Sequence, residues 1–269
     1  MSKIVDTKIE YIPIKHLSVV WIQSQRPYNS KWSREIADNF DPDKFDPIIV
    51  TKPNGQGQYH IIEGQHRRHA LEMYAAKYGN TNPGNEQAPC RIVADADPSR
   101  AAEIWLGISE GRKAVRPIYG FLVAVVARRE PEVTIQQLIN NNDFVVSPHK
   151  NKDSISAVGA LKTVFERHGK MTLNNVLRTI RLMWGGDPTA VSAVMLRGFG
   201  IFLHEFGTHV DTRRMVAKIA DSWSPYKLAE AAKARKHSTT ERLDEAIAEL
   251  LLREYNKSLK DNAKLRRKG

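Results

Sequence analysis

The chain has 269 residues, of which 41% are hydrophobic and 26% charged, a composition typical of globular proteins with real cores. No apolar run approaches the roughly 18 to 20 residues that a membrane-spanning helix needs, and the first residues lack the apolar core of a signal peptide. A single cysteine, Cys90, excludes an internal disulfide and fits a reducing compartment. We therefore expect a cytoplasmic protein that has no membrane partner.

The net charge of +11 is concentrated in the second half of the chain. Residues 1–144 hold 18 Lys/Arg and 17 Asp/Glu, a net charge of +1, whereas residues 145–269 hold 23 and 13, a net charge of +10. An acidic polymer is therefore expected to contact the second half. The alternative interpretation is a generically basic, solvated surface.

Strand and helix signals alternate in the first part of the chain. The predicted strands are residues 9–17, 47–52, 58–62 and 90–94, and the predicted helices are residues 33–40, 66–78 and 98–109. A turn-forming segment, Pro53 to Gly57, joins the second and third strands as a hairpin. This alternation predicts a small mixed α/β domain.

From about Arg116 onward the pattern changes to helices separated by glycine and proline. The predicted helices are residues 117–128, 155–165 and 172–184, a helix opened by Asp187-Pro188 that runs toward Phe206, and one opened by Ser224-Pro225. Ser238 to Glu241 has the spacing of a capping box. The expected fold class is therefore α+β. The expected domains are a mixed α/β domain over residues 1–122, an all-α basic domain over residues 123–256, and a basic tail over residues 257–269 that acts as a disordered electrostatic arm.

The segment Gln58 to Leu71 joins an apolar β-like run, a glycine and a basic helix start. Gly64 allows a sharp backbone turn that brings free N–H groups toward a ligand. The helix N-terminus and the forked guanidinium groups of Arg67 and Arg68 attract phosphate. Because the helix dipole disfavours cations in a first turn, two arginines there favour a bound anion over a merely exposed turn.

The order of these motifs resembles the N-terminal domain of the ParB/sulfiredoxin superfamily, known from chromosome and plasmid partition proteins. Gly64, Arg67 and Ala70 match positions of that family's Gly-Glu-Arg-Arg box, and Arg26 matches an arginine that precedes the helix before the second strand. The segment Ser109-Glu110-Gly111-Arg112 resembles the family's Glu-Asn-x-x-Arg box. The resemblance covers roughly residues 8 to 122.

The resemblance implies a nucleotide or phosphate pocket, with CTP or ATP and magnesium as the expected cofactors. The expected binding residues are Arg26, Gly64, Gln65, His66, Arg67, Arg68, Ser109, Glu110 and Arg112. Glu63, directly before the glycine, is a candidate magnesium ligand or catalytic base; its alternative role is that of an exposed carboxylate at a strand end. We expect no zinc, because His66 and His69 lack a clear third ligand.

Two departures from the family pattern limit the expected chemistry. Ile108 and Ser109 stand where nucleotide-hydrolysing partition proteins have a carboxylate and an amide for a magnesium-bound triphosphate, so CTPase or ATPase activity is expected to be weak or absent. Gln65 stands where sulfiredoxins have a catalytic cysteine, and without a thiolate that chemistry has no nucleophile.

The basic second half predicts a surface for double-stranded DNA. A helix-turn-helix unit within Met171 to Phe206, with its turn at Trp184 to Pro188, is one way to present that surface, although any helical bundle has such turns. The expected DNA-contacting residues are Arg178, Arg181, Arg197, Arg213, Arg214, Lys218, Lys233, Arg235 and Lys236.

Three functional hypotheses follow. The first is a nucleoid-associated, ParB-like DNA-binding protein of a phage, plasmid or other mobile element, with a nucleotide pocket. The second is a nuclease or phosphoryl-transfer enzyme, a DNase or NTPase, on the same fold, with Glu63 and Arg67 near the reaction centre. The third is a degenerate N-terminal scaffold followed by a protein-interaction module. The fold alone cannot decide among them, and the DNA site and a homodimeric state stay open.

Overall fold

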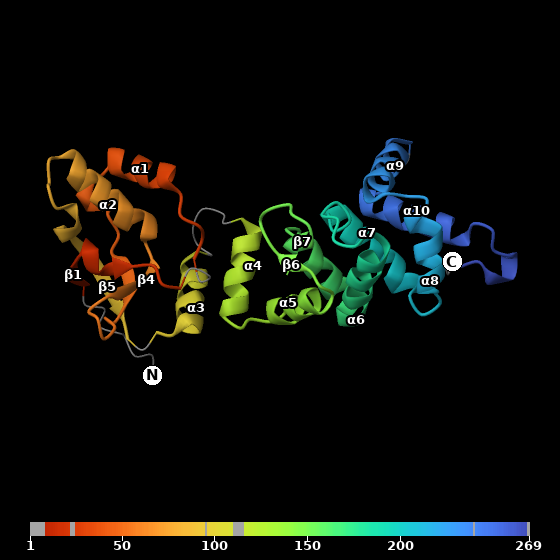
Figure 1. Cartoon of the computed structure of the whole chain (residues 1–269), viewed down its shortest axis with the longest axis horizontal. Helices are drawn as coiled ribbons and strands as arrows, with labels where there is room; N and C mark the ends of the chain where they lie inside the picture. Colours follow the sequence, from red (N-terminus) through yellow and green to blue (C-terminus); the bar gives the residue numbers. More distant parts are fainter. Residues whose placement is uncertain (1–8, 22–24, 95, 110–115, 239, 268–269) are drawn as a thin grey trace. The chain divides into compact units, whose positions relative to one another are not determined.

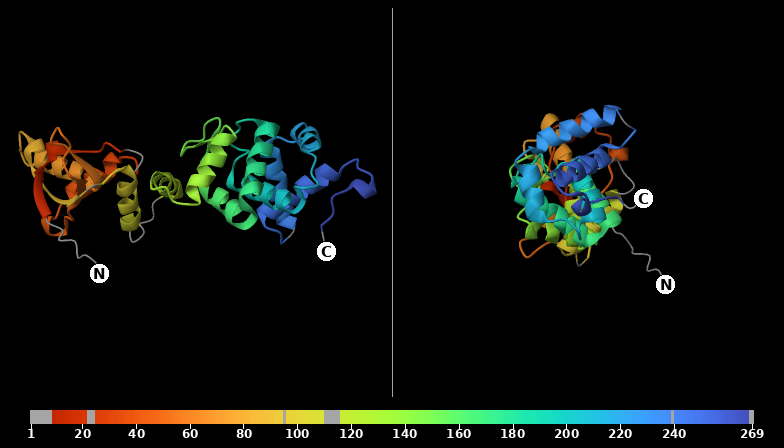
Figure 2. Two further views of the ribbon diagram at one scale, coloured as in Figure 1. Left: turned by 90° about the horizontal axis from the view of Figure 1, so that it is seen from below. Right: turned by 90° about the vertical axis from the view of Figure 1, so that its right-hand side faces the viewer.

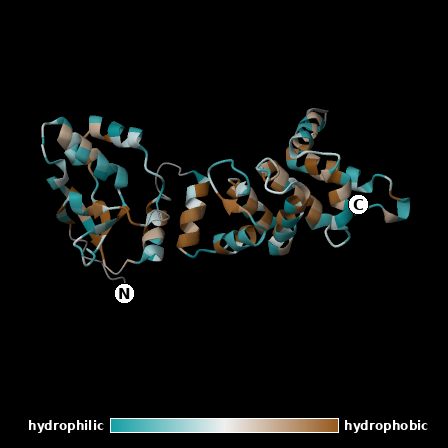
Figure 3. Ribbon diagram, in the orientation of Figure 1, coloured by the Kyte–Doolittle hydropathy of each residue, from teal (hydrophilic) through white to brown (hydrophobic). Residues whose placement is uncertain are grey.

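A computed structural model of the chain contains two compact units, residues 1–129 and residues 130–269, which are described separately (Figure 1). It describes residues 9–21, 25–94, 96–109, 116–238 and 240–267. The first unit extends beyond the expected limit at residue 122, because α4 (Pro117–Val126) packs against α3 (Pro98–Ser109). Trp105 and Leu106 of α3 meet Val123 and Ala124 of α4, and Figure 3 shows α4 as largely hydrophobic.

The first unit contains a five-stranded mixed sheet with the order β1-β5-β3-β4-β2. Its strands are β1 (Ile9–Pro13), β2 (Leu17–Ser18), β3 (Ile48–Thr51), β4 (Tyr59–Glu63) and β5 (Gln87–Val93). β3 and β4 form the predicted antiparallel hairpin, and β5 pairs parallel with β3 and antiparallel with β1. The predicted strand over residues 9–17 is interrupted by a 3-10 turn, Ile14–His16, that separates β1 from β2.

Helices lie on both faces of this sheet. Successive side chains of a strand point to opposite faces, so neighbouring residues of β4 contact different helices. Ile61 of β4 packs with Ile48, Val50 and Leu71, the last from α2 (Gln65–Lys77). Its neighbour Ile62 packs instead with Ile49 and with Ala101 of α3. α1 (Ser30–Asp38) packs against α2. The end of β4 and the start of α2 therefore lie on the side of the sheet where α1 and α2 pack.

Cys90, in β5, lies in the core of the first unit. Its side chain is fully buried, and burial raises the pKa of its thiol to about 12. A thiol with so high a pKa carries almost no thiolate at neutral pH, which is inconsistent with nucleophilic chemistry.

The second unit is helical apart from two short strands. Its helices are α5 (Glu132–Asn141), α6 (Val158–Trp184), α7 (Ala193–Phe206), α8 (Thr212–Met215), a π-helical turn (Val216–Ala220), α9 (Pro225–Ser238) and α10 (Leu243–Asn256). The strands β6 (Val145–Val146) and β7 (Ser154–Ile155) pair in parallel. α7 packs against α6 and α10, and Figure 2 gives two further views of these helices.

Glycine positions determine two features of this unit. Gly169, at φ 86°, breaks α6 into two helical segments, which agrees with the two separate helices predicted over residues 155–165 and 172–184. Gly198 of α7 lies against α10, where an added Cβ would fall 2.4 Å from Ile247 Cγ2. Only glycine therefore lets these two helices approach so closely.

Two predicted helix starts in this unit are wrong. α7 begins at Ala193 rather than after Asp187, because Asp187 Oδ1 accepts a hydrogen bond from Thr189 N at 2.7 Å in a turn that precedes the helix. The capping interaction of α10 involves Arg242 N, which donates to Glu245 Oε2 at 2.8 Å, rather than residues 238–241.

The C-terminal tail packs back onto the second unit through Arg267, so the expected disordered arm is wrong for the described residues. The Asn256 side chain donates to Leu265 O at 2.8 Å and accepts from Leu265 N at 2.9 Å. Arg267 pairs with Glu249 at 2.5 Å and with Glu205 at 3.6 Å. Within the described residues, none of the helices combines the length and the apolar character that crossing a bilayer requires.

Candidate functional site

Gly64 directly precedes α2, adopts φ 108° and has no side chain to cap the helix. The first internal hydrogen bond runs from Arg68 N to Gly64 O at 2.9 Å, so the N–H groups of Gln65, His66 and Arg67 are the terminal donors of the helix. An added Cβ at residue 64 would lie 3.2 Å from Ile48 Cγ2 and 3.2 Å from Arg67 Nη2. The positive φ therefore favours glycine here, and a Cβ would also crowd Ile48. The helix start carries positive potential.

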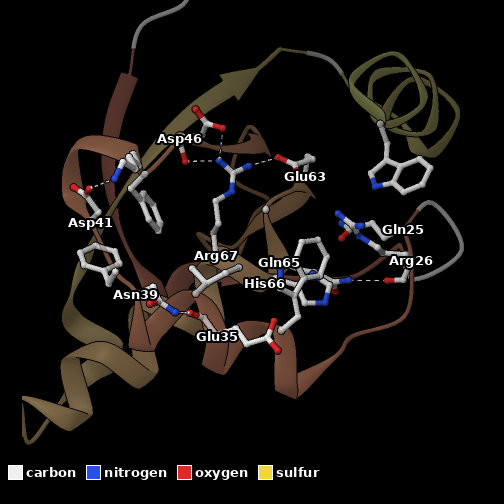
Figure 4. A pocket seen from close by; sticks show the side chains of 17 residues that line it. Gln25, Arg26, Glu35, Asn39, Asp41, Asp46, Glu63, Gln65, His66 and Arg67 are labelled. Carbon is white, nitrogen blue, oxygen red and sulfur yellow. Dashed lines mark hydrogen bonds and ion pairs between the residues drawn. The ribbon is translucent and has the colours of Figure 1, made fainter. Parts of the chain in front are cut away.

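A pocket of about 660 Å³ opens beside this helix start (Figure 4). Its volume lies within the roughly 300 to 1,000 Å³ range of small-molecule sites. It is lined by Gln25, Arg26, Trp32, Glu35, Ile36, Asn39, Phe40, Asp41, Lys44, Phe45, Asp46, Glu63, Gly64, Gln65, His66, Arg67 and Trp105. Aromatic rings, three cations and four carboxylates therefore share this space.

Arg67 lines this pocket but is held by protein groups. Its guanidinium donates to the Glu63 carboxylate and to the Asp46 carbonyl oxygen, and Nη1 donates to Pro47 O at 3.3 Å. Its side chain is 14% exposed and that of Glu63 is 11% exposed. In Figure 4 the Arg67 side chain points between Asp46 and Glu63. Arg67 therefore fastens the end of β4 to the residues that lead into β3, and its charge is already shared with Glu63.

Glu63 is not the exposed strand-end carboxylate that one interpretation of the sequence allows. It lies mostly buried in the pocket wall, paired with Arg67. Within the described residues, no three His, Cys, Asp or Glu side chains gather into a metal-binding group. The wall therefore offers no complete protein cage for magnesium.

Arg26 and Gln65 close one end of the pocket. The Arg26 guanidinium carbon lies 4.2 Å from the centroid of the Trp32 ring, a cation–π arrangement. Gln65 Nε2 donates to Arg26 O at 2.6 Å, which ties the loop that carries Arg26 to the start of α2. The structure thus brings together Arg26, Gln65 and Gly64, three residues that the sequence singles out.

His66 is a neutral positioning residue rather than a cation. Its Nε2 accepts a hydrogen bond from Asn29 N at 3.0 Å, which leaves the proton of the neutral ring on Nδ1. Burial, together with the nearby Arg26 charge, lowers the pKa of His66 to about 4. Its ring lies 4.5 Å from Trp32 and 5.6 Å from Tyr28, measured between ring centroids. His66 therefore holds the loop before α1 in place.

A second pocket, of about 540 Å³, shares Arg26, Trp32 and His66 with the first. Its lining residues are Arg26, Pro27, Tyr28, Asn29, Ser30, Trp32, His66, Arg116 and Tyr119. Among these described residues there are two arginines and no carboxylate. Arg116 directly precedes α4, and its side chain does not cap the N-terminus of that helix. The Arg116 guanidinium carbon lies 5.6 Å from the centroid of the Tyr119 ring. This pocket therefore suits an anionic group beside an aromatic surface better than the first does.

The other predicted ligand residues are not gathered at these pockets. Arg68 pairs with Glu72 of its own helix and lines neither pocket, and Ser109 at the end of α3 lines neither. Glu110 and Arg112 lie outside the described residues. Sequence reasoning missed Trp32, Tyr28 and Tyr119 as pocket residues, because single aromatic residues resemble core residues until the fold places them.

Four of the predicted DNA-contacting arginines are bound within the second unit. Arg181 donates from Nε to Asn142 O at 3.0 Å, pairs with Asp153, and lies 3.9 Å from the Phe144 ring. Two others bind a carboxylate: Arg197 Nε lies 3.1 Å from Asp244 Oδ2, and Arg235 pairs with Glu241 at 2.7 Å. Arg214 binds backbone carbonyls, since its Nη2 donates to Tyr255 O at 3.0 Å and to Lys257 O at 2.7 Å. These arginines hold the helices together, so their guanidinium groups are largely occupied.

The remaining predicted DNA contacts lie nearer the surface. Arg178, Arg213 and Lys236 are exposed and Lys218 is half-buried, and none of them has an ion-pair partner among the described residues. Lys233 pairs with Glu230 at 2.6 Å, but both side chains are exposed, so water competes with that pair. As DNA contacts these five residues remain a prediction.

α7 cannot serve as a DNA-reading helix, which makes the predicted helix-turn-helix within residues 171–206 wrong in that respect. From Ala193 to Leu203 every residue is buried or half-buried. The turn from Gly185 to Ser192 is also longer than the 3 to 4 residues typical of that motif. A helix enclosed by its neighbours has no face to insert into a groove.

No protein-family model matches the chain, and no curated protein matches it. Among solved structures, the chain is similar to the C-terminally truncated chromosome-partitioning protein ParB from Caulobacter crescentus, whose crystal structure contains CTP-γ-S. The alignment covers 92% of this chain and 98% of that one, with 12% sequence identity and a TM-score of 0.31. A similarity at this level carries no argument about the ligand, which has to rest on the side chains themselves.

Proposed function

We propose that the chain is a ParB-like DNA-binding protein that binds a nucleotide in its first unit and double-stranded DNA through its second. The observation that carries the nucleotide proposal is the position of Arg26. This residue lies over Trp32 in the wall shared by two pockets, next to the uncapped start of α2. Cation, aromatic ring and helix N-terminus together match the phosphate and the base of a nucleotide.

The distribution of charge indicates where each part of the nucleotide fits. Phosphate groups fit the side of Arg26 and Arg116, because that pocket has no carboxylate among its described lining residues. The larger pocket carries Glu35, Asp41 and Asp46 beside its aromatic rings, so it favours an uncharged base or sugar. CTP and ATP both remain candidates, since side chains alone do not select the base.

Magnesium, in this proposal, arrives with the nucleotide. Protein sites commonly hold Mg²⁺ through one or two carboxylates plus the phosphates of the substrate. Glu63 is the carboxylate nearest the start of α2, and its pairing with Arg67 reduces its availability as a ligand or base. The nucleotide would therefore act as a ligand rather than as fuel, and the nuclease or phosphoryl-transfer alternative is the weaker one.

A thermal stabilisation screen tests the nucleotide proposal on the full chain. A ligand that binds only the folded state adds about 2.7 kcal/mol at a hundredfold excess over its dissociation constant. A nucleotide that binds, among CTP, ATP and GTP with and without magnesium, should therefore raise the melting temperature of the wild type and of Arg68→Ala by the same amount, and that of Arg26→Ala clearly less. Turnover is measured in the same samples. Steady-state hydrolysis well above about one per minute that is lost in Arg26→Ala would favour the enzyme alternative.

The DNA proposal is tested by the salt dependence of binding. If about four to six phosphates are neutralised, the logarithm of the binding constant should fall with the logarithm of salt concentration by about 0.9 per phosphate. Arg213→Ala and Lys218→Ala should each weaken binding and reduce that slope by about one contact. Lys31→Ala, which removes an exposed cation of the first unit, is the matched control and should leave the slope unchanged. Absence of binding at low salt would contradict the proposal.

A further inference from the structure

The second segment of α6, after the break at Gly169, has an exposed stripe along one face. Met171, Asn175, Arg178 and Leu182 recur at spacings of four, three and four residues, which places them in a row on a helix. All four are exposed, Met171 to 71% and Leu182 to 53%. The row is about 16 Å long at 1.5 Å per residue, which corresponds to about five base pairs of DNA at 3.4 Å each.

This stripe lies on the face of α6 that points away from the core. The opposite face of the same segment forms the core, since Leu173, Val176, Leu177 and Ile180 are each fully buried. Arg178 has no ion-pair partner among the described residues, whereas Arg181, one turn further on, is held by Asp153. Two large apolar side chains and a cation are therefore presented to solvent on one face of the helix.

The charge on this segment indicates which kind of partner covers the stripe. Residues 170–184 contain Lys170, Arg178 and Arg181 and no Asp or Glu. If two copies of the stripe faced each other, Lys170 and Arg178 would meet like charges with no carboxylate of the segment to compensate, which is unfavourable. A polyanion has the complementary charge.

We infer that this stripe of α6 reads base edges in the major groove of double-stranded DNA. The inference rests on the proposed DNA-binding function and assigns its sequence-reading element. Arginine makes paired hydrogen bonds to guanine and asparagine makes them to adenine, and apolar side chains contact the thymine methyl group. Arg178 and Asn175 supply the first two contacts one helical turn apart, and Met171 and Leu182 supply apolar contacts at the two ends.

The test selects preferred sites from a random duplex library with the full-length protein. It then compares affinity for the selected site with affinity for a scrambled duplex. Removing one paired base contact should reduce this ratio by roughly 5- to 150-fold, because such a contact contributes roughly 1 to 3 kcal/mol and 1.4 kcal/mol is tenfold. We expect Asn175→Ala and Arg178→Gln each to lower the ratio and to relax selection at one or two adjacent base pairs. Binding of Asn175→Ala to the scrambled duplex should stay unchanged.

Lys260→Ala is the matched control, because Lys260 is an exposed cation elsewhere in the second unit. It should leave the ratio unchanged. If the wild type binds DNA with a sequence preference that both stripe variants retain, the inference is overturned while the proposed DNA binding stands. Equal affinity of the wild type for all duplexes also overturns it. Absence of any DNA binding overturns both. If Met171→Ser and Leu182→Ser change the sedimentation of the protein and not its DNA preference, the stripe is a self-association surface instead.

Discussion

Replacing Arg67 with alanine tests whether this residue is primarily a structural clamp. The substitution would remove the cation paired with Glu63, whose side chain is only 11% exposed, and the donor to the carbonyls of Asp46 and Pro47. Removing one partner of a buried ion pair costs roughly 3 to 5 kcal/mol. Since both side chains keep some exposure, we expect the lower end, about 3 kcal/mol.

The neighbouring Arg68 provides an internal control of the same residue type. It pairs with Glu72, also four residues away, but the Glu72 side chain is 36% exposed, so solvent weakens the pair. Arg68→Ala should therefore cost no more than about 1 kcal/mol. Two adjacent arginines, each with a glutamate partner, should thus differ about threefold in their contribution to stability.

Scanning calorimetry of the full chain at pH 7.5 measures this difference. For a unit of this size, about 3 kcal/mol corresponds to a fall of roughly 10 °C in the melting temperature of the first unit. Arg67→Ala combined with Glu63→Gln should recover part of the loss, because the double variant no longer buries that charge. If Arg67→Ala proves no more damaging than Arg68→Ala, the clamp is refuted and Arg67 is available to a ligand.

Three further predictions concern stability. Arg181→Ala should lower the free energy of unfolding of the second unit by about 2 kcal/mol, since Asp153 loses a charge-assisted hydrogen bond; an unchanged denaturant midpoint would show that the arginine is dispensable for the fold. Burial lowers the pKa of His60 from 6.5 to about 4, so the unfolded state binds the proton more tightly. Stability should therefore fall as the pH drops from 6.5 toward 4, and His60→Asn should flatten that pH profile; an identical profile in the variant would count against it. Gly198→Ala, with its Cβ 2.4 Å from Ile247 Cγ2, should cost roughly 1 to 3 kcal/mol in urea denaturation, and a neutral result would mean that the two helices can separate.

The elements with strong local signals were predictable from the sequence. α3 has the predicted bounds, Pro98–Ser109, because a proline at its start marks the boundary. The β3–β4 hairpin also formed as expected. α5 (Glu132–Asn141) was missed, since its four apolar residues are interspersed with four asparagine and glutamine residues. The start of α10 was predicted too early, because the capping pattern lies at residues 238–241 whereas the helix begins at Leu243.

The backbone conformation of the candidate site was predictable from the sequence, but the partners of its arginine side chains were not. Gly64 was identified correctly as a conformational requirement, because few other residues tolerate a positive φ at a helix start. The partners of Arg67 were not evident, since Glu63 lies in a strand, where the helical spacing rule does not apply. Arg181 shows the same limit more strongly. Its partner Asn142 is 39 residues away in sequence, and no local pattern encodes such a contact.

The most direct test of the nucleotide pocket is a calorimetric titration of the full-length protein. CTP and ATP are titrated, with and without magnesium, into the wild type, Arg26→Ala and Arg68→Ala. We expect saturable binding of about one nucleotide per chain, at least about tenfold weaker in Arg26→Ala, because a hydrogen bond to a charged group contributes roughly 1.5 to 3 kcal/mol. Arg68→Ala should bind like the wild type. Equal affinity in Arg26→Ala and the wild type, or no saturable binding at millimolar nucleotide, would contradict the proposed site.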